Sequence, residues 1–349
     1  MTRLIWIGVA LIASAATFIL DVPKGLPAPD LPAENPLSGA KVELGRYLFY
    51  DKRLSGNGQQ SCATCHEQSK AFTDGRKVAI GSTGQHHTRN SMSLVNIAYA
   101  SRLTWANPEL DTLESQALVP LQGKAPIELG FLKVPADPVY QRLFPLAFPE
   151  SKGAFTIQNV AKALACFERT ILSARSPYDR FHFDGDESAI SEAAKRGEAH
   201  FFTDGIGACF RCHSGPNLGG GPGFFNTGLY NLSGRFSYPE TNLGLYVFSK
   251  KPEDVGKFRA PSLRNIALTA PYMHDGSVAT LEEVVDHYAT HGRKLPSGDG
   301  SKNPNRDPRM GTIYLTRQNR LDLIEFLKSL TDEDLVHDPR FSNPWPSGR

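Results

Sequence analysis

The sequence predicts a mainly α-helical protein divided into two domains. Its 349 residues, 40% of them hydrophobic, are enough to bury two cores. Apolar residues recur at helical spacing in seven segments, whereas the alternating pattern of strands is scarce. One short cysteine motif also occurs twice, at Cys62 and Cys209, which are 147 positions apart. The expected helices cover residues 37–50, 110–121, 137–147, 156–173, 188–203, 280–290 and 316–330, and Thr316 is the expected N-cap of the last one.

The N-terminal segment has the features of an export signal. One positive charge in M-T-R precedes an apolar run of 17 residues from Leu4 to Leu20, with small residues towards its end. This length is the lower limit for spanning a bilayer, so a retained anchor stays as the alternative to a cleaved signal over residues 1–20. Residues 21–36 follow as a Pro-rich tether, for which we expect little packing. The mature protein is therefore expected in the periplasm, without a stable membrane span.

The charge balance restricts the possible partners. The chain carries 38 basic and 36 acidic residues, a formal net charge of +2, and no basic run stands out. Neither a nucleic acid nor an anionic membrane surface is indicated as a partner.

Four of the five cysteines lie in two copies of the motif C-x-x-C-H. The copies are S-C-A-T-C-H, with Cys62, Cys65 and His66, and A-C-F-R-C-H with the residues listed below. This motif attaches c-type haem, because the two thiols form thioethers and the histidine takes the proximal site of the iron. A zinc site or paired disulfides are the alternatives, but neither explains a histidine directly after both pairs. The second copy consists of Cys209, Cys212 and His213.

The separation of the motifs indicates one haem in each domain. We place an N-terminal c-type haem domain at residues 37–180 and a C-terminal one at residues 181–349. The fifth cysteine, Cys166, lies in A-K-A-L-A-C-F-E-R-T-I-L on an apolar helical face, and we expect it to be a buried core thiol.

Two longer blocks carry a family resemblance. The first is L-G-R-Y-L-F-Y-D-K-R-L-S-G-N-G-Q-Q-S-C-A-T-C-H followed by A-F-T-D-G, and the second is F-R-A-P-S-L-R-N-I-A-L-T-A-P-Y-M-H-D-G-S. With the two C-x-x-C-H motifs, the sequence resembles the di-haem cytochrome c peroxidase/MauG family over nearly all of residues 37–332. The resemblance implies two cytochrome c-like haem domains that face each other across a bound Ca²⁺. It assigns the calcium ligands to Asn90 and to the backbone carbonyls of Thr269 and Pro271.

Tyr288, in E-V-V-D-H-Y-A-T-H-G, is the residue by which the resemblance distinguishes two branches of the family. The peroxidase branch has a methionine ligand of the second haem seventeen residues after the proline of the P-Y-x-H-D/N-G block, and the MauG-like branch has tyrosine there. Counting from Pro271 gives Tyr288. A phenolate oxygen favours ferric and higher states, whereas a thioether raises the potential. The alternatives are a core tyrosine, or another ligand among Met273, His274, His287, His291 and Met310.

The resemblance also assigns residues around the first haem. Glu128, in A-P-I-E-L, corresponds to the distal acid of the family, Gln116 to a second polar residue, and Pro120 to a nearby wall. An acid–base group beside a vacant iron position is what cleavage of a peroxide O–O bond requires. His86 and His87, in G-Q-H-H-T-R-N, are either loop residues or a cap of this haem, and both interpretations stay open.

Trp105, in R-L-T-W-A-N-P, corresponds to the family's tryptophan between the haems, where an indole can relay charge. The resemblance implies an enzyme in which hydrogen peroxide generates a high-valent di-haem state that oxidises a side chain of a partner protein over a distance. Tryptophan is the expected target, and members found in methanobactin gene clusters convert one to kynurenine. The alternatives are a cytochrome c peroxidase that takes electrons from a small cytochrome or cupredoxin, and a non-enzymatic di-haem electron carrier.

Overall fold

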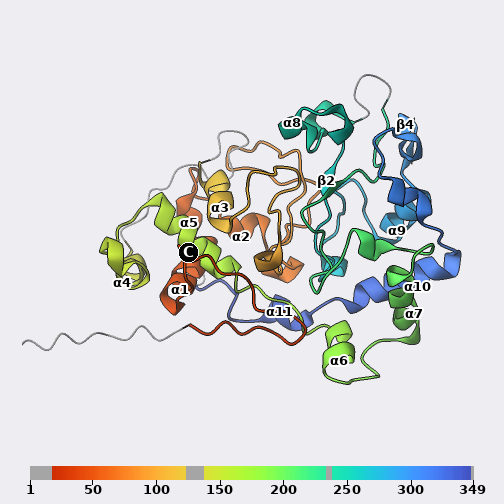
Figure 1. Cartoon of the computed structure of the whole chain (residues 1–349). Coiled ribbons are helices and arrows are strands. Elements are labelled where there is room, and N and C mark those ends of the chain that lie inside the picture. The colour runs from red at the N-terminus through yellow and green to blue at the C-terminus, as the bar shows by residue number, and fades with distance from the viewer. Residues whose placement is uncertain (1–17, 123–136, 233–237, 347–349) are drawn as a thin grey trace, which may run out of the picture.

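The computed structural model describes residues 18–122, 137–232 and 238–346, and in these ranges the fold is mainly helical with little sheet, as predicted (Figure 1). Two small antiparallel sheets pair β1 with β2 and β3 with β4. The described helices are α1 Gly39–Tyr50, α2 Cys62–Cys65, α3 Leu113–Gln122, α4 Pro138–Ala147, α5 Ile157–Glu168, α6 Pro177–Phe183, α7 Glu192–Phe202, α8 Tyr246–Ser249, α9 Leu281–Ala289, α10 Arg317–Ser329 and α11 Glu333–His337, and the strands are β1 Phe224–Phe225, β2 Phe258–Arg259, β3 Lys294–Leu295 and β4 Gly298–Asp299.

All seven predicted helical segments contain a helix of the structure, and Thr316 caps α10 in a capping box with Asn319. The largest boundary error is at α5, which ends at Glu168 instead of residue 173. The prediction missed α6, although Ser176, Pro177 and Asp179 form a capping box with proline in the first turn, which is a recognised start signal.

The two largest hydrophobic cores of the described residues lie one in each half of the chain. The first lies between α1, α3, α4 and α5, and the second surrounds α7, α9 and α10. Each core has one close helix crossing at a glycine. A methyl group on Gly45 of α1 would overlap the Ala163 carbonyl group of α5, and one on Gly197 of α7 would overlap the Asp322 carbonyl group of α10. Glycine therefore sets how closely these helix pairs approach.

The C-terminal residues return to the first core. Leu335 and Val336 of α11, together with Phe341 and Trp345, are buried among the side chains of α1, α4 and α5. The Trp345 Nε1–H donates to the Tyr47 carbonyl oxygen at 3.0 Å. The end of the chain thus belongs structurally to the first core, whereas the proposed boundary at residue 180 stays a prediction.

Residues 21–36 are mostly exposed or half-buried, but a few of their side chains are buried. Leu26 is buried, and Asn35 is only 1% exposed. The Asn35 amide donates to Glu114 Oε1 at 2.6 Å and to the Lys162 carbonyl oxygen at 3.0 Å. Proline-rich composition limits regular hydrogen bonding, but it does not prevent single side chains from filling gaps in a neighbouring core.

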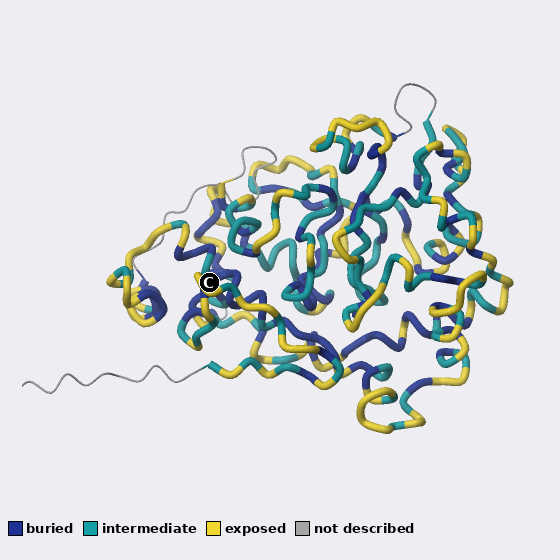
Figure 2. Tube along the Cα trace, viewed as in Figure 1, coloured by how far each residue is buried: buried dark blue, intermediate teal, exposed yellow. Residues whose placement is uncertain are grey.

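Burial follows the two cores and the loops between them (Figure 2). Buried residues occur in α5, in α10 and in the central loops, and exposed residues lie mainly along the periphery. Within the described ranges, every helix is too short or too polar to cross a bilayer.

Candidate functional site

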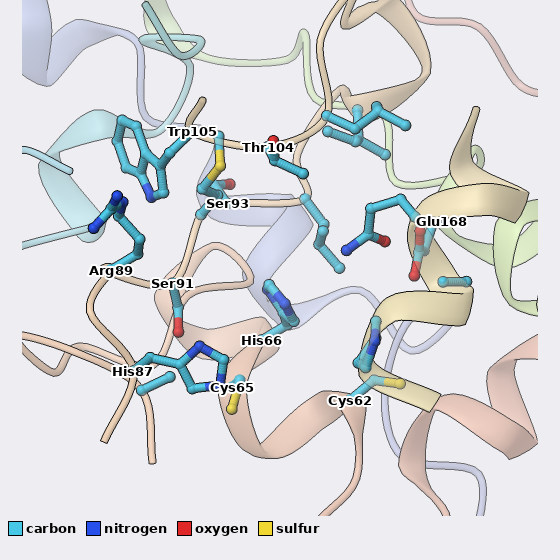
Figure 3. Close-up of a pocket in the computed structure, with 18 of the residues that line it drawn as sticks. Cys62, Cys65, His66, His87, Arg89, Ser91, Ser93, Thr104, Trp105 and Glu168 are labelled. Carbon is cyan, nitrogen blue, oxygen red and sulfur yellow. The ribbon is translucent and has the colours of Figure 1, made fainter. Parts of the chain in front are cut away.

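The first C-x-x-C-H motif opens onto a cavity of about 350 Å³, here called the first cavity. Cys62 and Cys65 are the ends of the single-turn helix α2, and His66 is its C-cap. Figure 3 shows these three residues below the pocket, with Trp105 and Arg89 at one end and Glu168 at the other. Gln116 and Pro120 of α3 also line this cavity, as the distal assignment requires.

The orientation of His66 suits a proximal ligand. Its Nδ1 lies 2.9 Å from the Phe72 carbonyl oxygen, so Nδ1 carries the proton and Nε2 is left with its lone pair. Burial lowers the pKa of His66, which keeps the ring neutral. A neutral imidazole with a fixed tautomer is the form that binds iron.

The second motif repeats this arrangement at a cavity of about 190 Å³, here called the second cavity. Cys209, Cys212 and His213 line it, and His213 Nδ1 lies 3.0 Å from the Pro261 carbonyl oxygen. Burial lowers the pKa of His213 to about 4. All five cysteines lie in the described ranges and none is in a disulfide. Two thiols and one neutral imidazole at each cavity fit two covalently attached haems.

Tyr288 projects from α9 into the second cavity, the one that His213 lines. Burial raises the pKa of Tyr288 above its ordinary value, so its hydroxyl stays protonated unless a cation binds the oxygen. Of the rival ligands, Met273, His274 and Met310 also line this cavity. His291 is directed elsewhere, because its Nε2 lies 2.7 Å from the Ile313 carbonyl oxygen.

Trp105 is a residue of both cavities. Its Nε1–H donates to the Asn90 carbonyl oxygen at 2.8 Å, and its own carbonyl accepts from the Arg259 N–H at 2.9 Å. The indole faces the His274 ring edge-on, with ring centroids 6.4 Å apart. These contacts hold the indole between the two cavities.

The three predicted calcium ligands, Asn90, Thr269 and Pro271, all lie in the described residues. The Asn90 amide Nδ2 donates to the Arg76 carbonyl oxygen at 2.8 Å, which leaves Oδ1 as the atom suited to a cation. The Thr269 hydroxyl donates to the Ile266 carbonyl oxygen at 3.1 Å, and Pro271 follows a cis peptide bond. In the described ranges no three His, Cys, Asp or Glu side chains form a metal cluster, and calcium stays a prediction.

The other two assignments concern the distal acid and the histidine cap of the first haem. Glu128 lies outside the described residues. His86 is exposed, whereas His87 is half-buried and lines the first cavity. Only His87 therefore remains a candidate cap of the first haem.

Sequence reasoning missed Glu168, which lines the first cavity from the end of α5. It is 6% exposed, and burial raises the pKa of its carboxyl to about 8. The sequence did hold a signal, because Glu168 follows Phe167 and Cys166 on a helix whose neighbouring positions are apolar. Cys166 itself is fully buried, as predicted, and burial raises the pKa of its thiol to about 11.

Comparisons with known proteins agree with this geometry. The family described as di-haem cytochrome c peroxidase matches residues 39–188. Cytochrome-c peroxidase IdrP1 of Denitromonas iodatirespirans is 33% identical, with 90% of this chain and 87% of the relative covered. Methylamine utilization protein MauG of Methylorubrum extorquens is 36% identical, with 86% and 81% covered.

Solved structures give the same result. A MauG-like protein associated with microbial copper homeostasis is 46% identical, covers 94% of this chain and 100% of its own, and superposes with a TM-score of 0.89. The di-haem peroxidase BthA from Burkholderia thailandensis, 21% identical with 90% of each chain covered and a TM-score of 0.63, shares the fold. From its relatives and its two motif-bearing cavities, the chain belongs to the di-haem cytochrome c peroxidase/MauG family and is a haem-dependent oxidoreductase.

Proposed function

We propose that this chain is a periplasmic, MauG-like enzyme that uses hydrogen peroxide to oxidise a side chain of a partner protein. Peroxide as oxidant follows from the family. The observation that carries the rest is Tyr288, which lines the second cavity together with His213. The 46% identity to a MauG-like protein supports the same branch. When bound, the two haems would supply the two-electron oxidation by peroxide.

Each protein group has a defined task in this proposal. His66 and His213, oriented by the carbonyls of Phe72 and Pro261, hold the two irons. Tyr288 is the second ligand at the second cavity, where its oxygen loses its proton to become a hard anionic donor. Gln116 lines the first cavity, and Glu128 is the family's distal residue that would assist O–O cleavage.

Trp105 connects the two sites. It borders both cavities and is held by hydrogen bonds at its Nε1–H and at its carbonyl. Its indole would share oxidising equivalents between the haems, so that the protein substrate need not enter either cavity. We propose a tryptophan of the partner as the target and its conversion to kynurenine as the outcome, because the sequence resembles members that carry out this conversion.

Tyr288→Phe and Tyr288→Met test the proposal. Peroxide alone should give a persistent oxidised species in the diferric wild type, and both variants should lose it. Tyr272→Phe is the matched control, because Tyr272 lines the same cavity but its hydroxyl bonds the Ile266 carbonyl oxygen at 3.1 Å. Electron paramagnetic resonance of the ferric wild type should show one high-spin and one low-spin haem. Normal formation of the species in both Tyr288 variants would refute the ligand assignment.

A conventional cytochrome c peroxidase is the second candidate, because Met273 and Met310 also line the second cavity and relatives carry that name. It predicts that Met273→Leu or Met310→Leu changes the low-spin haem signal and that a reduced small cytochrome or cupredoxin supports turnover. Calcium is tested separately. Chelation should change the spectrum of the wild type, and Asn90→Ala should remove that response.

A further inference from the structure

The side chain of Glu168 is a buried carboxyl group at the wall of the first cavity. It is 6% exposed, and no described residue forms a hydrogen bond with its Oε2 atom. Figure 3 shows Glu168 at the pocket. It lies at the end of α5, which packs against α3, the helix that carries Gln116 and Pro120. Such groups in native proteins are rare, because burying a polar atom without a partner costs free energy.

The neighbouring cationic side chains form their hydrogen bonds with groups other than Glu168. The Arg169 guanidinium donates to both oxygens of Glu114 on α3, at 2.6 and 2.8 Å. On α1, which packs against the other side of α5, the Lys41 ammonium donates to Asn35 Oδ1 at 3.1 Å. Burial has the largest effect on the pKa of Glu168 and raises it, whereas Arg169 lowers this pKa and Glu114 raises it.

The titratable groups of the cavity wall do not supply a counter-charge either. Burial lowers the pKa of His66 and of His87, so both rings are neutral near pH 7. The Arg89 guanidinium donates to the Thr241 carbonyl oxygen at 3.0 Å and is drawn at the other end of the pocket. A carboxylate without a paired cation is unfavourable at such a position, and the neutral acid is the stable form.

A neutral carboxyl group has one O–H donor, and the first cavity is the space beside it. We propose that Glu168 is a proton-carrying residue of the peroxide reaction, which delivers a proton to the oxygen that leaves when the O–O bond breaks. Peroxide releases one proton to water on binding; the O–O bond then breaks, the leaving oxygen takes the proton of the Glu168 carboxyl and departs as water, and the Glu168 carboxylate regains a proton from water. The two electrons that reduce peroxide are those that the haems supply in the family's established peroxide reaction.

This inference needs only the peroxide chemistry of the family and is independent of the partner protein and of Tyr288. It is also separate from the distal assignment to Glu128, because Glu168 lies at the end of α5 in the first core. A carboxyl group on a packed helix has a fixed position, which general acid catalysis requires.

The first test is infrared difference spectroscopy of the diferric holoenzyme, without peroxide. A protonated carboxyl band should be present at pH 7, shift in D₂O and disappear as the pH rises through about 8. The band should be missing in Glu168→Gln and present in Glu150→Gln, which changes an exposed glutamate of the same half. If Glu168→Gln retains the band, a different carboxyl group produces it and the proposal fails.

The second test is the stopped-flow rate of the peroxide reaction between pH 5 and 9 in the same proteins. The wild-type rate should fall as the pH passes about 8, and Glu168→Gln should be slower by about a hundredfold near pH 7, with that pH dependence removed. Unchanged rates in Glu168→Gln would make Glu168 a structural acid only and overturn the proposal.

Glu168→Asp covers the case in which the glutamine variant does not fold. It retains the acid but moves it back by one methylene, so it should keep the infrared band and the pH dependence with a reduced rate. Haem content, measured as two haems per chain, is the control for folding in every variant. A Glu168→Asp enzyme whose rate no longer depends on pH near 8 would also contradict the proposal.

Discussion

Gly45→Ala is expected to destabilise the first core through the crossing of α1 and α5. An added Cβ atom would lie 2.7 Å from the Ala163 carbonyl carbon and 2.9 Å from the Phe167 Cβ atom, besides overlapping the Ala163 carbonyl oxygen. Carbon atoms in contact are normally about 3.5–4.0 Å apart, so the helices must separate by roughly 1 Å. Because the obstacle is backbone on a packed helix, no rotamer change can relieve it.

The magnitude follows from two opposing effects. Overpacking a core costs about 1–3 kcal/mol, and a backbone clash belongs at the upper end of this range. Replacing glycine by alanine in a helix interior returns about 1 kcal/mol. The net loss is about 2 kcal/mol of unfolding free energy, which corresponds to a fall in Tm of about 3 °C for a protein of this size.

The assay is thermal unfolding of the holoprotein followed by circular dichroism, with Gly39→Ala as the matched control. Gly39 lies on the same helix, and its nearest neighbour would be 3.8 Å from an added Cβ atom. Gly39→Ala should leave Tm within about a degree of the wild type, since surface changes of this type are nearly neutral. If Gly45→Ala melts together with Gly39→Ala, the crossing does not depend on glycine and the geometric reasoning is wrong.

Three further outcomes are expected. Replacing Cys209 and Cys212 together by serine should leave one covalent haem per chain instead of two, which mass spectrometry of the intact protein measures; two retained haems would contradict the attachment. Trp345→Ala should lower the unfolding free energy by about 3–5 kcal/mol in urea titration, because a buried indole is removed from the first core. Hydrogen bonds from Arg196 lower the pKa of Asp322 in the folded state. The ionised Asp322 therefore stabilises the folded state at a pH above the unfolded carboxyl pKa of about 3.9, and this contribution is lost as the pH falls. Asp322→Asn should therefore show a smaller loss of stability than the wild type below about pH 4, and equal losses would refute the linkage.

The sequence predicts those parts of the protein that depend on local patterns. The two C-x-x-C-H motifs predict where the cavities form, because thiols and histidine must converge within one turn of chain. Helical periodicity predicts the main helices, because it reports the face that each helix buries. The packing of Trp345 beside Tyr47 has no such signal, since it joins residues 298 positions apart.

The same limit applies to the candidate site. Periodicity predicts that the segment around Cys166 is buried, but it does not say that Glu168 opens onto a cavity while Cys166 packs against Asn35. Trp105 was singled out by resemblance alone, and its position at both cavities depends on contacts between the two halves of the chain. Long-range packing decides which polar side chain faces a site, and no local pattern encodes it.

The return of the C-terminal residues to the first core affects how the protein assembles. Phe341 and Trp345, which complete the wall beside α1 and α5, lie about 300 positions further along the sequence than α1. The first core is therefore complete only when residues from the second half of the chain have joined it.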